Sequence, residues 1–192
     1  TVPELLQSAG YHTYMAGKWH LGREPEHHPG EKGFEKYFMT SEGGANHYNN
    51  LGILPQAPNS KYFENGKEVE WPEDAYSTDF YTDKLIEYID SNLEDDKPFF
   101  TFAAYTSPHW PLQVDEEYWK KYKGRYDEGY EALRQQRLES LKKAGMIPEN
   151  AILPEMNSRV KPWEELSPEE QKKEARKMEL YAGMVDNLDY NV

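Results

Sequence analysis

The run Phe99-Phe100-Thr101-Phe102-Ala103-Ala104-Tyr105 constrains the fold of this chain more than any other feature of its sequence. A nearly unbroken apolar run of this length is typical of a β-strand that is buried on both faces. Ser77 is the expected N-cap of a helix that precedes this strand. The apolar residues of that helix recur every four positions, at Tyr81, Leu85, Ile89 and Leu93.

A second helix-strand pair begins the chain. Residues 4–8 predict a short helix that ends at Gly10, and residues 11–16 predict a short β-strand. A helix followed by a strand, twice over, favours an α/β fold with a mainly parallel sheet flanked by helices. Further along, Asn65-Gly66 is a tight hairpin signal with residues 62–64 and 67–69 as its arms.

The remaining segments are more polar. The stretch from Arg23 to Asn65 is rich in Gly, Pro and Asn, and we expect an ordered loop there. Residues 118–144 have a helical pattern that is broken by glycines, and residues 147–162 form a linker that contains prolines. We expect one aromatic face of the 118–144 segment to pack on the sheet: Tyr118, Trp119, Tyr122, Tyr126 and Tyr130.

The composition excludes several classes of function. Among 192 residues, 22 are basic and 35 are acidic, which gives a net charge of −13 and disfavours nucleic acid and anionic membranes as partners. Mean hydropathy is −1.00, and no apolar run is long enough to span a membrane. Cysteine is absent, so disulfides, thiolate metal sites and cysteine nucleophiles are excluded within this stretch. An aromatic content of 14% still indicates a folded chain.

Helix-capping signals lie close to both ends. Thr1 begins a capping box that leads directly into the first helix, and Ser167 begins another. The helix after Ser167 continues to the last residues without a glycine cap or a proline. We therefore expect residues 1–192 to be an internal fragment of a larger domain. Such a fragment would leave sheet edges open and would tend to self-associate through them.

Two groups of chemically capable side chains follow the two predicted strands. Lys18 and His20 come after the first strand, and His109 comes after the second. Ligands of open α/β sheets bind beyond the carboxyl ends of the strands, so the three side chains could face one cleft and bind an anion. Lys18 and His20 would point the same way if residues 17–21 stay extended. The alternative is a surface lysine with two structural histidines.

Other candidate sites are weaker. His27-His28 lies in a polar loop without a matching third ligand, so a metal site is not expected there. Residues 42–48 contain Gly43-Gly44, which would allow a ligand to approach the backbone but would equally serve a tight turn. No GK[ST] sequence follows, so this loop is not a phosphate-binding P-loop.

Several stretches of the sequence, in the same order along the chain, resemble the type I sulfatases, the arylsulfatase family. The resemblance covers nearly the whole sequence, and His109 lies where the family has its catalytic histidine. The similar stretches are residues 4–11, Gly17-Lys18-Trp19-His20-Leu21-Gly22, Lys32-Gly33-Phe34-Glu35, Gly43-Gly44-Ala45-Asn46-His47-Tyr48, residues 98–111, residues 122–129 and residues 181–189.

The resemblance implies an alkaline-phosphatase-like α/β fold, only part of which is present, within the N-terminal catalytic domain of a sulfatase. It implies hydrolysis of small-molecule or carbohydrate sulfate esters by a formylglycine hydrate, with calcium binding the sulfate oxygens. Lys18 would bridge a sulfate oxygen and the formylglycine, His20 would act as a base, and His109 would donate a proton to the leaving oxygen. Asn46 and His47 would line the substrate pocket. A periplasmic or secreted location is favoured over a cytoplasmic one.

The sequence also departs from the family pattern. It contains no C/S-x-P-x-R motif, which supplies formylglycine, and it lacks the aspartate and Asp-Asn ligands of calcium. Asp186-Asn187 lies in a predicted helix, where we expect it to pack rather than to bind metal. The 192 residues alone are therefore expected to be inactive. Two alternatives stay open: a phosphonate or phosphate ester hydrolase of the same superfamily, and a non-catalytic module that binds sulfated ligands.

Overall fold

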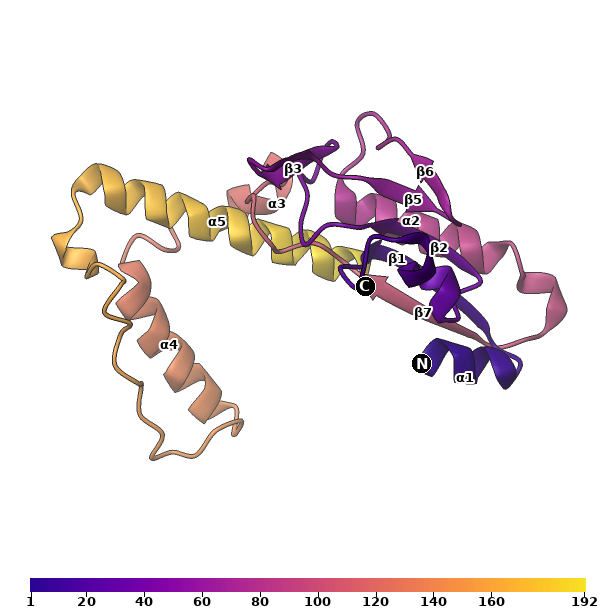
Figure 1. Ribbon diagram of the computed structural model, residues 1–192. Helices are drawn as coiled ribbons and strands as arrows, with labels where there is room; N and C mark the ends of the chain where they lie inside the picture. Colours follow the sequence, from indigo (N-terminus) through magenta and orange to yellow (C-terminus); the bar gives the residue numbers. More distant parts are fainter. The chain divides into compact units, whose positions relative to one another are not determined.

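A computed structural model describes all residues from Thr1 to Val192, in two compact units (Figure 1). The first unit comprises Thr1–Gln113 and Asn187–Val192. The second comprises Val114–Asp186 and is helical. No helix in the structure is sufficiently long and apolar to cross a membrane.

The first unit is built on a five-stranded sheet with the order β6-β5-β2-β1-β7. The strands β2, β1 and β7 are parallel to one another, while β5 and β6 add an antiparallel hairpin. The α/β class predicted from the sequence is confirmed, but the sheet is mixed rather than mainly parallel. The strands are β1 (His12–Lys18), β2 (Lys36–Thr40), β5 (Tyr62–Glu64), β6 (Lys67–Val69) and β7 (Phe99–Ala104).

Side chains of β1 alternate between two apolar cores, as the period of two along a strand requires. Tyr14 and Ala16 enter the core beneath α2 (Ser77–Asp90), whose residues Tyr81 and Leu85 pack there. Met15 enters the opposite core. β1 is buried on both faces and is hydrogen-bonded to a strand on each side, so it is an interior strand of the sheet. The opposite core also holds Trp19, Phe34, Tyr37 and Met39.

The short elements around the sheet agree with the sequence in part. The helix α1 (Val2–Ser8) has the predicted capping box at Thr1, and Asn65-Gly66 joins β5 to β6 as expected. The prediction of a loop from Arg23 to Asn65 was wrong, because β2 lies within it. Flanking polar and glycine-rich residues concealed this strand, which is apolar only over Tyr37–Met39. The same stretch contains two 3₁₀ turns, Pro25–His27 and Pro29–Lys32, and the strands β3 (Leu51–Leu54) and β4 (Ala57–Asn59).

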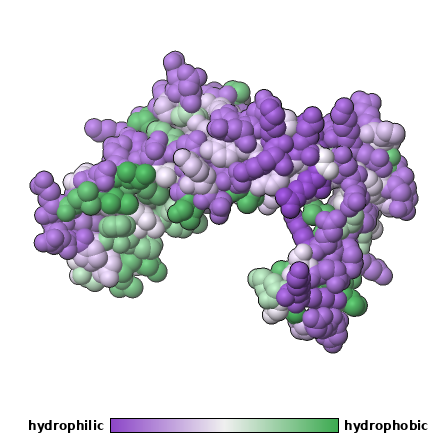
Figure 2. All heavy atoms as spheres, turned by 180° about the vertical axis from the view of Figure 1, so that it is seen from behind, coloured by the Kyte–Doolittle hydropathy of each residue, from purple (hydrophilic) through white to green (hydrophobic).

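The strand β7 is less buried than its sequence predicts. It pairs with β1 on one side and with no strand on the other, and Phe99 and Phe102 are 50% and 45% exposed. The prediction of burial on both faces was wrong for this chain, because an apolar strand is covered only where neighbours exist. Figure 2 shows hydrophobic side chains gathered over this part of the first unit. They surround an apolar hollow of about 310 Å³ lined by Pro3, Trp19, Leu21, Phe34, Phe100 and Phe102, with Thr1 and Lys32 at its rim.

In the second unit, the predicted aromatic face packs on a helix instead of the sheet. The Arg176 guanidinium lies 3.9 Å from the centroid of the Trp119 ring, and the Tyr122 hydroxyl donates to Asp186 at 3.1 Å. Both partners belong to the C-terminal helix α5, so these contacts form within the second unit. The α-helices in this part of the chain are α3 (Glu116–Trp119), α4 (Gly129–Lys143) and α5 (Pro168–Asn191). Two 3₁₀ turns accompany them, Lys120–Tyr122 and Trp163–Glu165.

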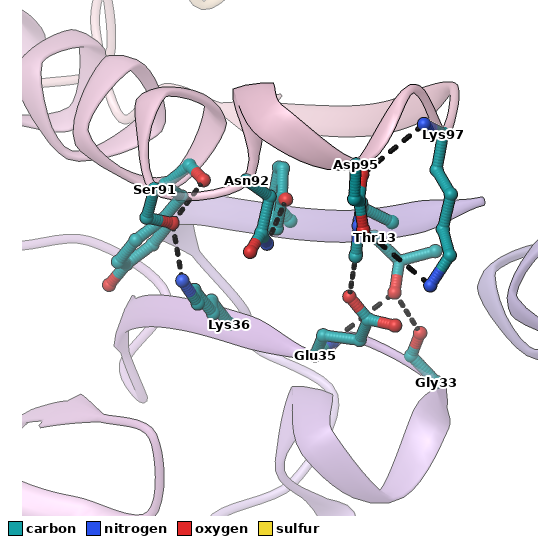
Figure 3. Close-up of polar contacts among 11 residues, drawn as sticks. Thr13, Gly33, Glu35, Lys36, Ser91, Asn92, Asp95 and Lys97 are labelled. Carbon is teal, nitrogen blue, oxygen red and sulfur yellow. Dashed lines mark hydrogen bonds and ion pairs between the residues drawn. The ribbon is translucent and has the colours of Figure 1, made fainter.

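His12, the first residue of β1, lies between two carboxylates. Figure 3 labels the residues that carry them, Glu35 and Asp95. His12 Nδ1 lies 2.6 Å from Glu35 Oε2, and His12 Nε2 lies 2.7 Å from Asp95 Oδ2. Since carboxylates only accept hydrogen bonds, the doubly protonated imidazolium fits this arrangement. The hydrogen bonds to Glu35 and then Asp95 raise the pKa of His12, although burial opposes them. The cluster joins β1 to the segment before β2 and to the 3₁₀ turn Leu93–Asp95.

This cluster predicts a pH-dependent stability. A raised folded-state pKa means that the stabilisation by His12 is complete below the unfolded value of about 6.5. It is lost as pH rises through the folded-state pKa. The substitution His12→Gln should therefore lower the free energy of unfolding by about 1–3 kcal/mol at pH 6 and by much less at pH 9. Urea unfolding over this pH range measures the difference.

The exposed His27 supplies the matched control for this experiment, since His27→Gln should leave the free energy of unfolding unchanged at every pH. A His12→Gln deficit of constant size from pH 6 to pH 9 would contradict a charged His12. At acid pH a second loss is expected, because the hydrogen bond from His12 lowers the pKa of Asp95. Stabilisation through Asp95 disappears as pH falls through that lowered value.

The open edge of β7 predicts self-association of the 192-residue chain. Phe99→Lys places a charge on this edge and should shift the chain from oligomer towards monomer in sedimentation velocity. Ile86→Lys is the matched control, because Ile86 is also 50% exposed but lies on α2. A monomeric wild-type chain at concentrations of about 100 μM, or an equal effect of both substitutions, would contradict this use of the edge.

Candidate active site

Three loops meet at the carboxyl edge of the three parallel strands. Lys18 ends β1, the loop from Ser41 to His47 follows β2, and the segment from Tyr105 to Gln113 follows β7. Because β1 is hydrogen-bonded to both β2 and β7 in parallel, the ends of all three strands share one edge of the sheet. The structure therefore brings Lys18, His20 and His109 to the same edge, where the sequence predicted a cleft.

The chain makes an unusual turn as it leaves β1. Gly17 has φ +121°, and a Cβ at this position would overlap the carbonyl oxygen of Ala104 on β7. His20 has φ 50°, which is uncommon for a residue with a side chain. Residues 17–21 are therefore not extended, and the expectation that Lys18 and His20 point the same way loses its basis. Lys18 is half-buried, His20 is exposed, and neither side chain makes a hydrogen bond or ion pair within the chain.

Two consecutive glycines lie against the two imidazole rings. A Cβ on Gly43 would lie 2.6 Å from His20 Cε1, and a Cβ on Gly44 would lie 3.2 Å from His109 Cε1. Consecutive Cα atoms are about 3.8 Å apart, so both rings stand beside the same short piece of backbone. The absence of side chains at Gly43 and Gly44 therefore leaves room for both histidines at one place.

His109 is oriented by backbone groups of its own loop. Its Nδ1 lies 2.7 Å from the Trp110 carbonyl oxygen, and its backbone N–H donates to the Thr106 carbonyl at 3.0 Å. A carbonyl oxygen only accepts, so Nδ1 must carry the proton. The remaining nitrogen, Nε2, makes no hydrogen bond within the chain and is available to a ligand. The ring is half-buried.

Asn46 and His47 differ from each other in their surroundings. The Asn46 side chain is half-buried, and its Oδ1 accepts from the Tyr48 backbone N–H at 3.0 Å. His47 is fully buried, and both of its ring nitrogens have partners: Ser77 Oγ at 2.7 Å and the His109 carbonyl oxygen at 3.0 Å. Burial lowers the pKa of His47, while the hydrogen bond to His109 opposes the shift. This placement does not fit direct contact of the His47 side chain with a substrate.

Two residues near the site were not foreseen as part of it. Ser77 was expected to cap α2, but its hydroxyl pairs with His47 and the helix has no side-chain cap. Gln113 Oε1 accepts from the His47 backbone N–H at 3.0 Å. Ser77 is 30 and Gln113 is 66 positions from His47. No local sequence signal links partners so far apart. The pair Gly43-Gly44, in contrast, did indicate that another group could approach the backbone closely at this loop.

The cofactors implied by the resemblance have no complete site in these 192 residues. No group of three or more His, Cys, Asp or Glu side chains is arranged to hold a metal ion. Asp186 pairs instead with Lys121 at 2.5 Å, and Asn187 donates to Asp79 at 2.9 Å. The oxygen donors of these 192 residues therefore do not fit a calcium site.

The contact between Gly43 and His20 predicts a local effect of a single methyl group. Gly43 does not have a positive φ, so Gly43→Ala is strained only by overlap with the His20 ring. We expect a displaced His20 ring, seen as a shifted Cε1–H signal in a ¹H–¹³C NMR spectrum, and an unchanged His12 signal. Gly30→Ala is the control, because its methyl would meet Tyr37 at 3.1 Å instead. An unmoved His20 signal in Gly43→Ala would show that the ring does not rest on this loop.

The chain is similar in sequence to known sulfatases. An uncharacterized sulfatase of Schizosaccharomyces pombe is 42% identical over 200 residues, covering 100% of this chain and 36% of that protein. An arylsulfatase of Klebsiella aerogenes is 38% identical over 195 residues, covering 100% of this chain and 41% of that protein. The chain thus spans about two fifths of the length of these relatives.

Solved structures support the fold. Ps i-CgsB, crystallised in complex with k-i-k-neocarrahexaose, has a TM-score of 0.61 at 24% identity, over 99% of this chain and 34% of that chain. A putative sulfatase, yidJ from Bacteroides fragilis, has a TM-score of 0.58 at 17% identity, over 98% of this chain and 37% of that chain. The expected alkaline-phosphatase-like fold is confirmed. A family model described as Sulfatase matches residues 1–192, and the chain therefore belongs to the sulfatase family.

Proposed function

We propose that the protein containing this chain hydrolyses sulfate monoesters, converting an ester and water into an alcohol or phenol and inorganic sulfate. The observation that carries the proposal is that Lys18, His20 and His109 come to one edge of the sheet, with the two imidazole rings beside Gly43-Gly44. An unpaired ammonium and two accessible imidazoles in a chain with net charge −13 form a local site for an anion.

Lys18 would bind the sulfate group. Its ammonium lies at the end of β1 without an intramolecular partner, so it can approach an oxygen of the ester. Negative charge builds up on oxygen as the ester bond breaks, and a fixed cation stabilises that charge. Lys18 is the last residue of β1, which is hydrogen-bonded to a strand on each side, and this pairing would hold its ammonium near the reacting group.

The two histidines would handle protons. Nδ1 of His109 keeps its hydrogen for the Trp110 carbonyl. The proton given to the leaving oxygen would therefore be a second one, carried on Nε2 by the imidazolium, which would leave the ring neutral. Departure of a neutral alcohol instead of an alkoxide lowers the barrier. His20, on the other side of the glycine pair, would accept a proton in the step that releases sulfate. Imidazole is suited to both roles because it exchanges protons near neutral pH.

Two further components belong to the proposed enzyme but not to this stretch. A formylglycine hydrate, where present, supplies the oxygen that attacks sulfur, and calcium, where present, supplies positive charge at the sulfate oxygens. The 192 residues contain no C/S-x-P-x-R motif and no calcium ligand set. We therefore propose that Lys18, His20 and His109 act together with groups contributed from outside residues 1–192.

Sulfated carbohydrates are the substrate class that we favour over other sulfate esters. Support comes from a structural relative, Ps i-CgsB, which was crystallised in complex with k-i-k-neocarrahexaose. The aromatic and amide groups near the edge, Trp110 and Asn46, suit a sugar ring and its hydroxyls. Trp110 is 51% exposed and follows His109 directly, so a substrate bound at His109 would lie beside it.

Replacing either Lys18 or His109 should abolish most of the activity. In the full-length protein that contains this chain, Lys18→Ala should lower kcat/KM for p-nitrophenyl sulfate by about 10²–10³-fold, because a charge-stabilising donor is lost. His109→Ala should lower it by about 10²–10⁴-fold through loss of proton transfer. Release of p-nitrophenol under initial-rate conditions is the measurement. Lys67→Ala is the matched control, since Lys67 is an exposed lysine of the β5–β6 hairpin.

The same assay separates the alternatives. A preference of the wild-type protein for p-nitrophenyl phosphate or a phosphonate ester would replace sulfate ester hydrolysis with the related phosphoryl chemistry. Sulfate binding, measured by calorimetry, that survives Lys18→Ala combined with His109→Ala would favour a non-catalytic module with another site. Equal activity of Lys18→Ala and Lys67→Ala would remove Lys18 from the mechanism.

A further inference from the structure

His47 links the helix α2 to the loop that carries His109. Its side chain is 0% exposed and lies between Ser77, the first residue of α2, and the His109 backbone. The link is double at the helix, because the Ser77 backbone N–H also donates to the His47 carbonyl oxygen at 2.9 Å. The Tyr76 ring stacks on the imidazole at 5.7 Å between centroids.

The partners of His47 determine where its proton sits. Its Nε2 faces the His109 carbonyl oxygen at 3.0 Å, and a carbonyl can only accept, so Nε2 carries a hydrogen. Burial disfavours the charged imidazolium and lowers the pKa of His47. In the neutral ring, Nδ1 is then unprotonated and accepts from the Ser77 hydroxyl at 2.7 Å. The His109 carbonyl therefore fixes the tautomer, and Ser77 is the donor that pairs with its unprotonated nitrogen.

The hydrogen bond reaches the backbone of His109 rather than its ring. Fixing the carbonyl of His109 restrains the peptide that joins it to Trp110, and the Trp110 carbonyl in turn accepts from His109 Nδ1 at 2.7 Å. The far end of the loop is also tied to this cluster. Gln113 accepts from the His47 backbone N–H through its side chain and from the Tyr76 hydroxyl, at 2.9 Å, through its carbonyl.

We infer that His47 is a positioning residue: as a buried neutral imidazole with its proton on Nε2, it sets the orientation of the His109 ring towards the leaving oxygen. The inference deepens the proposed function and rests on it. His47 would not touch the substrate. Its effect on the reaction would pass through the His109 peptide, while the Ser77 hydroxyl would donate to the other ring nitrogen of His47.

The tautomer can be tested without any catalytic assay. In protein labelled with ¹⁵N-histidine, long-range ¹H–¹⁵N NMR spectra at pH 7 should show His47 as a neutral ring protonated on Nε2. Ser77→Ala removes the donor to Nδ1 and should change the His47 nitrogen shifts, whereas Ser77→Thr keeps a hydroxyl and should preserve them. A charged His47, or a ring protonated on Nδ1, would overturn the inference.

Kinetics of the full-length protein test the positioning role. His47→Leu should lower kcat for p-nitrophenyl sulfate by about 10²-fold, because small displacements of a catalytic group have effects of this size. It should also alter the limb of the pH–rate profile that depends on His109. His47→Gln keeps an N–H able to reach the His109 carbonyl and should recover at least about 10-fold of that loss.

His28 provides a matched control for removal of a buried histidine. It is 4% exposed, and its Nε2 also pairs with a backbone carbonyl, that of Arg23 at 3.2 Å, on a loop away from His109. His28→Leu should lower the melting temperature as much as His47→Leu does but should leave kcat and the pH profile of the folded protein unchanged. If both variants lose only stability, or both lose kcat equally, His47 has no specific role in positioning.

Failure of the proposed function would look different. A wild-type protein that is inactive on sulfate esters, with His47 protonated on Nε2 and sensitive to Ser77→Ala, would refute sulfate hydrolysis. The orientation of His109 by His47 would then still be supported by the NMR result. An active wild-type protein with unchanged kcat in His47→Leu would refute the positioning role alone.

Discussion

The parallel pairing of β1 with both β2 and β7 is the constraint on which the rest of the first unit depends. It places the ends of three strands on one edge of the sheet and so gathers residues 18, 43, 44 and 109 from distant parts of the sequence. The pairing with β7 continues to Gly17, where any larger residue would overlap Ala104. A glycine is therefore required immediately before the first residue of the proposed site.

Stability and chemistry are separated along β1. His12, at its amino end, is clamped by Glu35 and Asp95, while Lys18, at its carboxyl end, has no partner. The strand of seven residues places these two positions about 20 Å apart. The satisfied cluster ties three segments together, and the unsatisfied lysine is left for a ligand. The strand β1 thus carries a residue that stabilises the fold at one end and a residue of the proposed site at the other.

Features of the fold that depend on local sequence could be predicted, and features that depend on distant neighbours could not. The Thr1 capping box and the Asn65-Gly66 hairpin follow from adjacent residues, and both are present. The exposure of β7 could not be predicted, because an apolar run does not reveal which strands lie beside it. The pattern did place Lys18, His20 and His109 at strand ends, and topology alone brought them to one edge. It could not reveal that Ser77 serves His47 instead of its own helix, since 30 positions separate them.

The position of α2 has an electrical consequence for the site. The helix has 14 residues, begins at Ser77 and lacks a side-chain cap. The partial positive charge of its dipole therefore lies next to His47, whose carbonyl oxygen accepts from the Ser77 N–H. A positive potential disfavours addition of a proton to the neighbouring imidazole. The helix therefore acts together with burial, and the neutral donor that holds His109 should persist under acidic conditions in which a solvent-exposed imidazole becomes charged.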